Sequence, residues 1–431
     1  MHSLLFQALA LTPCAVLRDA YTTDCCQRPP NTTVAADFKA PGVSVLLTTF
    51  LQGDYSSSGI PLAQGFRDWI SHHNADQSNM AVRVVECETS YDVEFGKKCI
   101  ADNVADVRAA VFFETTLSLS QAFKLGTLGV SQISAGYGEV FNKLSMLGDA
   151  HTSHSFYPAA NYADALSALK TYAGHDANTR IAFIGRGDLY TNPTAVIFKD
   201  RLGYNSTLWL TVNLPSTNIE ASITENMNSV ADHSPDAVYI MSFNNGTRFA
   251  LQTLKDIGFD MSKVFCIWWG ADAVEESGIE STGVKVLSYF DPLHNPLGAR
   301  SFYETIGTYS ALVFTETLRM ALHNMQTSKI FDADLTSYRT VTATAVHNAL
   351  ATFNLSSSRL SELGLTEFMS PCVMALGERQ GCDADVFVLE WMGNEWKRLA
   401  RVPYDAGTND PVAYTENPIF GSFVPYRRNQ L

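Results

Sequence analysis

Residues 43–50 read VSVLLTTF, and residues 59–70, shortly after them, read GIPLAQGFRDWI. The first run is short and mostly apolar, which is typical of a buried strand. In the second run the apolar side chains recur at the spacing i, i+4, i+7 and i+8 of one helix face, namely Leu62, Phe66, Trp69 and Ile70. We therefore predict a strand followed by an amphipathic helix, and the rest of the chain is read outward from this pair.

The alternation of a short apolar run and a longer stretch with helical spacing repeats as far as residue 290. Strands are expected at 82–87, 109–113, 130–134, 180–185, 208–212, 237–242, 264–268 and 284–290. Helices are expected near 93–105, 118–127, 193–202, 218–231, 247–258 and 272–278. Strands joined by helices form parallel sheets with right-handed crossovers, and there are too many strands here for one compact layer. The sequence therefore predicts an α/β fold with two doubly wound parallel-sheet lobes.

The pattern changes after residue 290. Two helices are expected, at 299–324 and 338–353, and then a hairpin of strands 385–391 and 396–402 that turns at Gly393-Asn394. Residues 403–431 are rich in Pro, Gly and Asn and are expected to form an irregular tail. The expected division is 43–155 plus 291–365 for lobe 1, and 156–290 plus 366–402 for lobe 2.

Charge and composition exclude several classes of protein. The 431 residues contain 30 Lys and Arg against 44 Asp and Glu, a formal net charge of −14. No Lys/Arg-rich run is present to neutralise phosphates, so we expect no nucleic-acid partner. The most apolar long segment, 301–325, is interrupted by Glu304, Glu316 and Arg319, so it predicts an amphipathic helix and no transmembrane span.

The N-terminus and the cysteines bear on cellular location. Residues 1–20 include an apolar stretch at 4–11 and form a candidate signal peptide, although a truncated or misassigned start is an alternative. Of the eight cysteines, two pairs are spaced to close small rings, Cys87 with Cys99 and Cys372 with Cys382. Free buried thiols are the alternative for these four. Disulfides would indicate a periplasmic or extracellular protein.

One loop has the position of a dinucleotide-binding loop. Residues 185–190, GRGDLY, follow an expected strand and precede an expected helix, but Tyr190 stands where the third glycine would be. The sequence has no GxxxxGK[ST], GxSxG or HExxH motif, and His151 and His154 have no third ligand at a useful spacing. We therefore predict no cofactor, no metal site and no enzyme activity; the alternative is a cytosolic doubly wound enzyme that binds a nucleotide at 185–190.

Hydroxyl side chains gather where the third expected strand leads into a helix. Residues 115–120 read TTLSLS. Hydroxyl groups and free backbone N–H groups at a helix N-terminus suit an anion such as a carboxylate. The alternative is ordinary capping of the helix, which needs only one of these residues.

In the order of its elements over residues 43–400, the chain resembles the type I periplasmic binding proteins. The similarity is to the binding proteins for branched-chain amino acids and amides of ABC importers, and to related receptor ligand-binding domains. It rests on 59–70, on the Thr/Ser loop before Gln121-Ala122, on GVSQIS at 129–134, and on AVYI at 237–240 with the following 251–258. The resemblance implies a non-enzymatic protein whose two lobes close on a small organic molecule in an interlobe cleft. The implied partner is an ABC-type permease, or a receptor dimer partner if the chain is an ectodomain. The position of Cys87 also resembles one where relatives carry a disulfide.

The resemblance carries the ligand-contacting loops over by position. They fall on Thr116, Ser118, Gly136 and Tyr137 in lobe 1, and on Tyr190, Phe243, Trp268 and Trp269 in lobe 2. Tyr190 would be the aromatic residue that stacks on the ligand.

The resemblance also implies an acidic residue near Trp269 to pair with a ligand ammonium group, and here two tryptophans stand in its place. Asp272, Asp188 and Glu114 are the candidate substitutes. Aromatic side chains favour an apolar, aromatic or cationic ligand held by stacking or cation–π contacts. The alternative for each tryptophan is a place in the core.

Overall fold

The structure of the chain, a computed structural model, describes residues 42–76, 79–135, 154–157, 159–160, 162–185, 199, 203–214, 228–298, 300–327, 341–373 and 384–403. The chain divides into two compact units, 1–39 and 40–431. All described residues belong to the second unit, and the expected signal peptide and C-terminal tail lie outside them.

The first sheet has five parallel strands in the order β2-β1-β3-β4-β5. Their bounds are β1 Val43–Thr49, β2 Val82–Glu88, β3 Ala109–Phe112, β4 Ser131–Ser134 and β5 Ser155–Phe156. The chain passes from β1 to β2 on one side and then returns to β3 on the other side of β1. The order of winding therefore reverses between β1 and β3, which is the topological switch point of this sheet.

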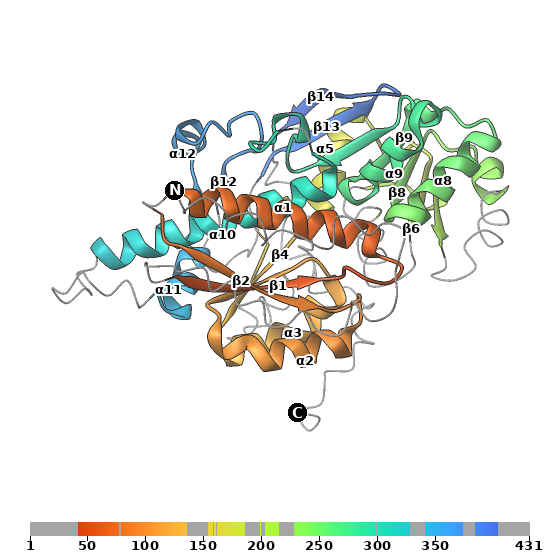
Figure 1. Cartoon of the computed structure of the whole chain (residues 1–431). Helices are drawn as coiled ribbons and strands as arrows, with labels where there is room; N and C mark the ends of the chain where they lie inside the picture. Colours follow the sequence, from red (N-terminus) through yellow and green to blue (C-terminus); the bar gives the residue numbers. More distant parts are fainter. Residues whose placement is uncertain are drawn as a thin grey trace, which may run out of the picture. The chain divides into compact units, whose positions relative to one another are not determined.

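Helices cover both faces of the first sheet (Figure 1). They are α1 Ser56–Ala75 on one face, and α2 Val93–Asn103 and α3 Thr115–Thr127 on the other. Alternate residues of β1 explain the arrangement, because side chains point to opposite faces of a strand. Val45 and Leu47 pack in the cluster that includes Phe66 of α1. Leu46 packs instead in the cluster that includes Ile100 of α2 and Leu117 of α3.

Two helices from the C-terminal half complete this lobe, α10 Phe302–Thr327 and α11 Ala343–Ala351. α10 packs against α1, and glycines allow the close approach. A Cβ at Gly65 would collide with the backbone carbonyl of Glu304, and a Cβ at Gly307 would collide with that of Leu62. Each helix therefore has a glycine where the backbone of the other is closest.

The second sheet has seven strands in the order β14-β13-β10-β9-β8-β6-β7. Their bounds are β6 Ile181–Gly185, β7 Trp209–Asn213, β8 Ala237–Met241, β9 Val264–Ile267, β10 Lys285–Ser288, β13 Val386–Trp391 and β14 Trp396–Val402. The five from β6 to β10 are parallel, and the predicted hairpin β13–β14 joins β10 antiparallel. Gly393 in its turn has a φ of 96°, a conformation that favours glycine. In this sheet β7 and β8 lie on opposite sides of β6, which is its first strand in the chain. The switch point therefore lies between β6 and β8.

The two sheets separate the chain as the expected lobes do, although the lobe boundaries themselves stay a prediction. The helices of the second part are α5 Tyr162–Ala173, α8 Asn244–Asp256 and α9 Ala271–Glu276. A short helix and a two-stranded pairing lie between α11 and β13, namely α12 Ser357–Glu362 with β11 Asn354–Leu355 and β12 Cys372–Val373. Among the helices of the described residues, none is long and apolar enough to cross a bilayer.

Several expectations about elements need correction. α3 begins at Thr115, three residues before the expected start, so its hydroxyl-rich residues form the first helical turn. β9 ends at Ile267, and residues 268–270 form a 3₁₀ turn. The sequence reading missed α5, although its buried Tyr162, Ala165, Leu166 and Leu169 have helical spacing. It also missed β5, β11 and β12, which are too short to show a period. The expected helices at 193–202 and 218–231 lie mostly outside the described residues.

The disulfide predicted between Cys87 and Cys99 is confirmed: it joins β2 to α2 with Cα atoms 5.6 Å apart. Cys372 is also disulfide-bonded, and Cys382, its predicted partner, lies outside the described residues. Cys266 is buried in β9 and is the one free cysteine of the described part.

Candidate functional site

The carboxyl ends of β1, β2 and β3 bring a group of polar residues together. Thr48 and Thr49 end β1, Thr89 follows β2, and Glu114 follows β3 by two residues. All four are at most 2% exposed. Ligands of open α/β sheets bind outside the carboxyl ends of the strands at the switch point, so this group occupies the position where a site is expected.

Glu114 is the central residue of this group. Its Oε1 accepts a hydrogen bond from the Thr89 hydroxyl, and its Oε2 is buried with no hydrogen-bond partner among the described residues. Burial raises the pKa of Glu114 to about 7, and the nearby Glu88 carboxylate adds to the rise, whereas the Thr89 and Thr48 hydroxyl groups oppose it. The carboxyl group is therefore poised to exchange a proton near neutral pH.

The loop between β2 and α2 holds an unusual backbone conformation. Ser90 and Tyr91 have φ values of 52° and 61°, which non-glycine residues rarely adopt. The Thr89 hydroxyl oxygen accepts a hydrogen bond from the Tyr91 N–H, and Glu88 accepts one from the Ser90 N–H. Each residue in this conformation costs on the order of 1–3 kcal/mol of folding free energy. Backbone strain of this kind concentrates at functional sites.

This loop places the Tyr91 ring among other aromatic rings at the strand ends. The ring of Tyr91 lies 4.4 Å from that of Tyr55 and 5.2 Å from that of Phe50, centroid to centroid. Phe50 follows β1 directly, and Tyr55 precedes α1. Three aromatic side chains from two loops therefore gather beside the buried Thr/Glu group.

The row of aromatic rings continues into residues that follow the second sheet. Phe243, two residues after β8, packs edge-on against Tyr55 at 6.1 Å and against Trp269 at 5.9 Å. Phe243 is half-buried and precedes α8. Phe243 thus lies beside the switch point of its sheet, and its ring connects the carboxyl ends of the two sheets.

Trp268 and Trp269 follow β9 and are packed on all sides. Trp268 is 0% exposed and stacks on Tyr162 at 5.0 Å, and its Nε1 has no partner among the described residues. Trp269 is 2% exposed; its Nε1 donates to the Tyr162 hydroxyl at 2.6 Å, and its carbonyl accepts from the Tyr303 hydroxyl at 2.7 Å. Trp269 packs edge-on against Phe243, whereas Trp268 packs against Tyr162 and Tyr289. Contact of either ring with a ligand stays a prediction.

The carboxylate of Asp272 is hydrogen-bonded to the backbone. Its two carboxylate oxygens accept hydrogen bonds from the backbone N–H groups of Phe302, at 2.9 Å, and Tyr303, at 3.2 Å. These N–H groups begin α10, so Asp272 in α9 acts as its N-terminal cap. Burial raises the pKa of Asp272 to about 7, and the two backbone hydrogen bonds oppose this rise. The pairing of Asp272 with a ligand stays a prediction.

The hydroxyl-rich start of α3 is partly committed to internal bonds. The Ser118 hydroxyl is buried and donates to Oε1 of Gln132 at 3.5 Å, and Gln132 donates to Ser155 at 2.6 Å. Thr116 lies in the first helical turn, and its side chain is outside the described part of the chain. The other candidates Gly136, Tyr137, Asp188 and Tyr190 lie outside the described residues as well.

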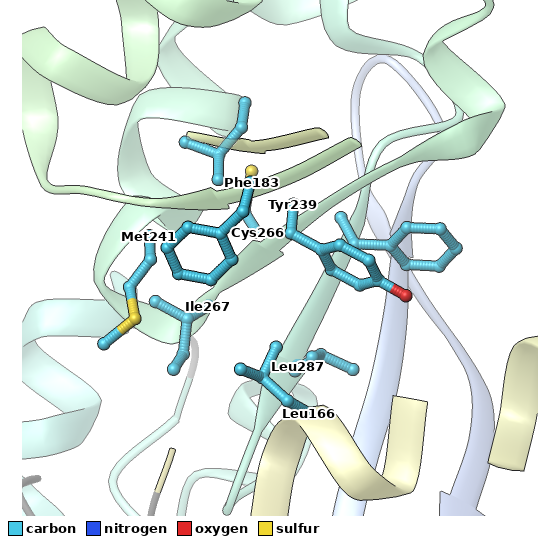
Figure 2. A pocket seen from close by; sticks show the side chains of 9 residues that line it. Leu166, Phe183, Tyr239, Met241, Cys266, Ile267 and Leu287 are labelled. Atoms are coloured by element: carbon cyan, nitrogen blue, oxygen red, sulfur yellow. The ribbon is translucent and has the colours of Figure 1, made fainter. Parts of the chain in front are cut away.

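One small pocket of the described residues does not suit a ligand. A small pocket beneath the second sheet is lined by Leu166, Phe183, Tyr239, Ile240, Met241, Phe265, Cys266, Ile267 and Leu287 (Figure 2). Its one polar side-chain group, the Tyr239 hydroxyl, is bonded to His175 at 2.7 Å. It is therefore a gap in the packed core. Among the described residues no three His, Cys, Asp or Glu side chains are placed to hold a metal ion, and His154 stacks on the ring of His347.

Sequence reasoning missed six residues of the site, namely Thr48, Thr49, Phe50, Tyr55, Thr89 and Tyr91. Each lies at the end of a predicted strand or within a few positions after it, and that placement was the available signal. Sequence reasoning named Glu114 only as a candidate partner for a ligand ammonium group. The burial of Glu114 depends on packing between strands, which the sequence does not show.

No protein-family model and no curated protein sequence matches the chain. Solved structures do match. One, described as an ABC transporter permease from the Pseudomonas fluorescens group, has a TM-score of 0.73 and 16% identity over 88% of this chain and 97% of that one. A branched-chain amino acid ABC transporter from Thermus thermophilus with bound valine has a TM-score of 0.68 and 14% identity over 87% and 99%. A solute-binding protein of an ABC transporter from R. palustris, in complex with benzoate, has a TM-score of 0.61 and 11% identity over 84% and 97%.

Proposed function

The chain has the type I periplasmic binding fold, and on that premise we propose that it binds a small organic molecule at the carboxyl ends of the strands of its two sheets. The observation that carries the proposal is the row of aromatic rings Tyr91, Tyr55, Phe243 and Trp269. This row passes both switch points, because Tyr55 lies in the loop after β1 and Phe243 in the loop after β8, and Tyr91 at its start follows Thr89, which is bonded to the buried carboxyl of Glu114.

The proposed mode of binding is closure of the two lobes on the ligand. A ligand that contacts both lobes binds the closed form more tightly than the open form, and this difference selects the closed form. Tyr55, which precedes α1, and Phe243, which follows β8, would each contact a ligand that binds beside their edge-on ring pair. Aromatic rings stack on flat or apolar groups and attract cations, so we propose an aromatic, apolar or cationic ligand.

The similar solved structures support this choice at the level of ligand size. One of them binds valine and another binds benzoate, both small molecules with a carboxylate and an apolar part. For this chain we propose a ligand of that size, and we propose no catalytic step. The neighbours described by function are transport and solute-binding proteins, which supports a binding role over the alternative of a doubly wound enzyme.

We further propose that the protein works outside the cytoplasm and delivers its ligand to an ABC-type permease. The disulfide between Cys87 and Cys99 supports an oxidising compartment. A receptor ectodomain would use the same ligand site, and no observation favours it over the carrier.

The test is a thermal-shift screen of the purified protein against amines, carboxylates, amino acids, amides and alcohols built on shared aromatic and aliphatic scaffolds. A ligand at about 100 times its Kd adds roughly 2.7 kcal/mol to the free energy of unfolding, which we expect to raise the Tm by about 3 °C or more. Phe243→Ala should abolish the shift. The matched control is Trp209→Ala, because Trp209 is an aromatic residue at the amino end of β7. A screen without any stabilising compound would contradict the proposal.

A further inference from the structure

Glu114 occupies the N-cap position of α3 but does not cap the helix. Its side chain makes no hydrogen bond to the free N–H groups of the first turn. Other caps in the chain do: Asp92 accepts from two N–H groups of α2, and Thr342 accepts from one of α11. The Glu114 carboxyl is therefore not used in stabilising the helix that follows it.

One oxygen of this carboxyl group is left without a bond. Glu114 is 2% exposed, and its Oε2 has no hydrogen-bond partner among the described residues. Buried polar atoms in native proteins are almost always bonded, so an unbonded carboxylate oxygen calls for an explanation. In the same helix, Oε1 of the buried Gln121 is also unbonded within the described part. Both atoms are acceptors, and what each lacks is a donor.

No positively charged side chain of the described residues pairs with Glu114 either. None of the ion pairs formed among the described residues includes Glu114. The charged group whose field acts on it is Glu88, another carboxylate, which already accepts hydrogen bonds from Thr49 and Leu51. A buried carboxylate is normally paired with a cation or shifted toward its protonated form.

We propose that Glu114 receives a protonated amine of the ligand, so that the first lobe recognises a cationic group between the Glu114 carboxylate and the rings of Tyr55 and Tyr91. This inference rests on the proposed function, because it assigns the chemistry of one part of that site. An ammonium group supplies the missing positive charge and three donors, one of which satisfies Oε2 of Glu114. The neighbouring rings add cation–π attraction.

The inference selects Glu114 among the three candidate partners for an ammonium group, which were Asp272, Asp188 and Glu114. Both oxygens of Asp272 accept hydrogen bonds from the first N–H groups of α10, and Asp188 lies outside the described residues. A ligand carboxylate at the Glu114 position would meet the unbonded Oε2 and the negative field of Glu88, whereas a neutral hydroxyl would donate one hydrogen bond to Oε2 but bring no positive charge. We therefore expect discrimination against anions at this position.

The test uses scaffolds of the thermal-shift screen in three matched forms, such as phenethylamine, 3-phenylpropanoate and 2-phenylethanol, with Kd measured by calorimetry at pH 8. The amine should bind at least tenfold more tightly than the other two, a factor equal to about 1.4 kcal/mol. Glu114→Gln should reduce this preference at least tenfold. The control Glu94→Gln removes an exposed carboxylate of α2 that pairs with Lys97, and should leave the preference unchanged.

The outcomes separate the two proposals. If stabilising compounds are found but carboxylates or alcohols bind as well as the matched amines, this inference is wrong and the proposed function stands. An amine preference that survives Glu114→Gln also overturns it. If no compound of any form binds, the proposed function fails, and this inference fails with it. The comparison of matched compounds needs only the wild-type protein, so it decides the matter even if Glu114→Gln does not fold.

Discussion

Thr89 donates a hydrogen bond to Glu114, although the two residues follow β2 and β3, which lie on opposite sides of β1. The bond therefore crosses the end of β1 and joins two loops that are 25 residues apart in the sequence. The same Thr89 hydroxyl oxygen accepts the Tyr91 N–H, so one side chain both orients the buried carboxyl group and holds the loop that carries the Tyr91 ring. The Thr89 side chain thus links the buried carboxyl group of the candidate site to the loop that carries one of its aromatic rings.

The raised pKa of Glu114 predicts a pH-dependent stability. The pKa rises from an ordinary value of 4.5 to about 7 on folding, so between these pH values the folded protein binds more protons at this group than the unfolded protein. Stability from this group is therefore greatest below about pH 4.5 and is lost as the pH rises to about 7, by about 3 kcal/mol in total. We expect Glu114→Gln to remove this contribution. Urea denaturation at a series of pH values, followed by tryptophan fluorescence, measures the difference between the variant and the wild type.

The matched control for that prediction is Glu94→Gln, which should keep the pH dependence of the wild type. Asp272 is unchanged in both variants, and its own raised pKa acts in the same direction. A wild type and a Glu114→Gln variant with parallel pH profiles would show that Glu114 is not buried as described.

Asp272 is predicted to stabilise α10. Asp272→Ala removes both acceptors from the N–H groups of Phe302 and Tyr303, and loss of such a cap costs about 1–2 kcal/mol. Asp272→Asn keeps one acceptor oxygen and should cost less. The control is Glu276→Ala, an exposed residue of the same short helix. Thermal denaturation measures the order, and equal Tm values for wild type and Asp272→Ala would refute the capping role.

The disulfide between Cys87 and Cys99 is predicted to stabilise the loop that carries Tyr91. It closes a ring across a sequence separation of 12, and the double variant Cys87→Ser/Cys99→Ser should lose about 3 kcal/mol of stability. Reductant should lower the Tm of the wild type more than that of the double variant. Mass spectrometry after alkylation tests the bond itself, since labelling of Cys87 without prior reduction would mean that it is absent.

The contact between Tyr55 and Phe243 is predicted to couple the two sheets energetically. Tyr55→Leu and Phe243→Leu keep an apolar side chain but remove the edge-on ring contact at 6.1 Å. A double-mutant cycle on the free energy of unfolding should give a coupling of about 0.5–1.5 kcal/mol. The same cycle with Tyr55→Leu and Trp209→Leu should give no coupling energy. Tyr55 lies at the carboxyl ends of the strands of the first sheet, and Trp209 lies at the amino end of β7 in the second. Zero coupling in the first cycle would mean that these rings do not touch in solution.

Much of the fold could be predicted because its strands are buried and its helices amphipathic. The run 43–50 and the helix face with Leu62, Phe66 and Ile70 appear in the structure as β1 and α1 within a few residues. The hairpin was predictable from Gly393, whose positive φ the turn requires. What the sequence could not show were two-residue strands such as β5, because a period needs several residues to become visible.

The site was less predictable than the fold, since its key properties arise from contacts between distant segments. The resemblance to type I periplasmic binding proteins implied Phe243 by its position, but the contact of Phe243 with Tyr55 depends on how the two sheets are placed. The capping role of Asp272 was not predictable, because the cap interaction spans thirty residues and leaves no local pattern. The hydrogen bond between Thr89 and Glu114 likewise joins residues that are 25 positions apart.

The most direct test of the account is calorimetric titration of the most strongly stabilising compound from the screen into wild type, Phe243→Ala and Trp209→Ala. The account predicts one binding site per chain in the wild type, an affinity at least tenfold weaker in Phe243→Ala, and an unchanged affinity in Trp209→Ala. Binding that is equally strong in all three proteins would place the ligand away from the carboxyl ends of the strands and would contradict the account.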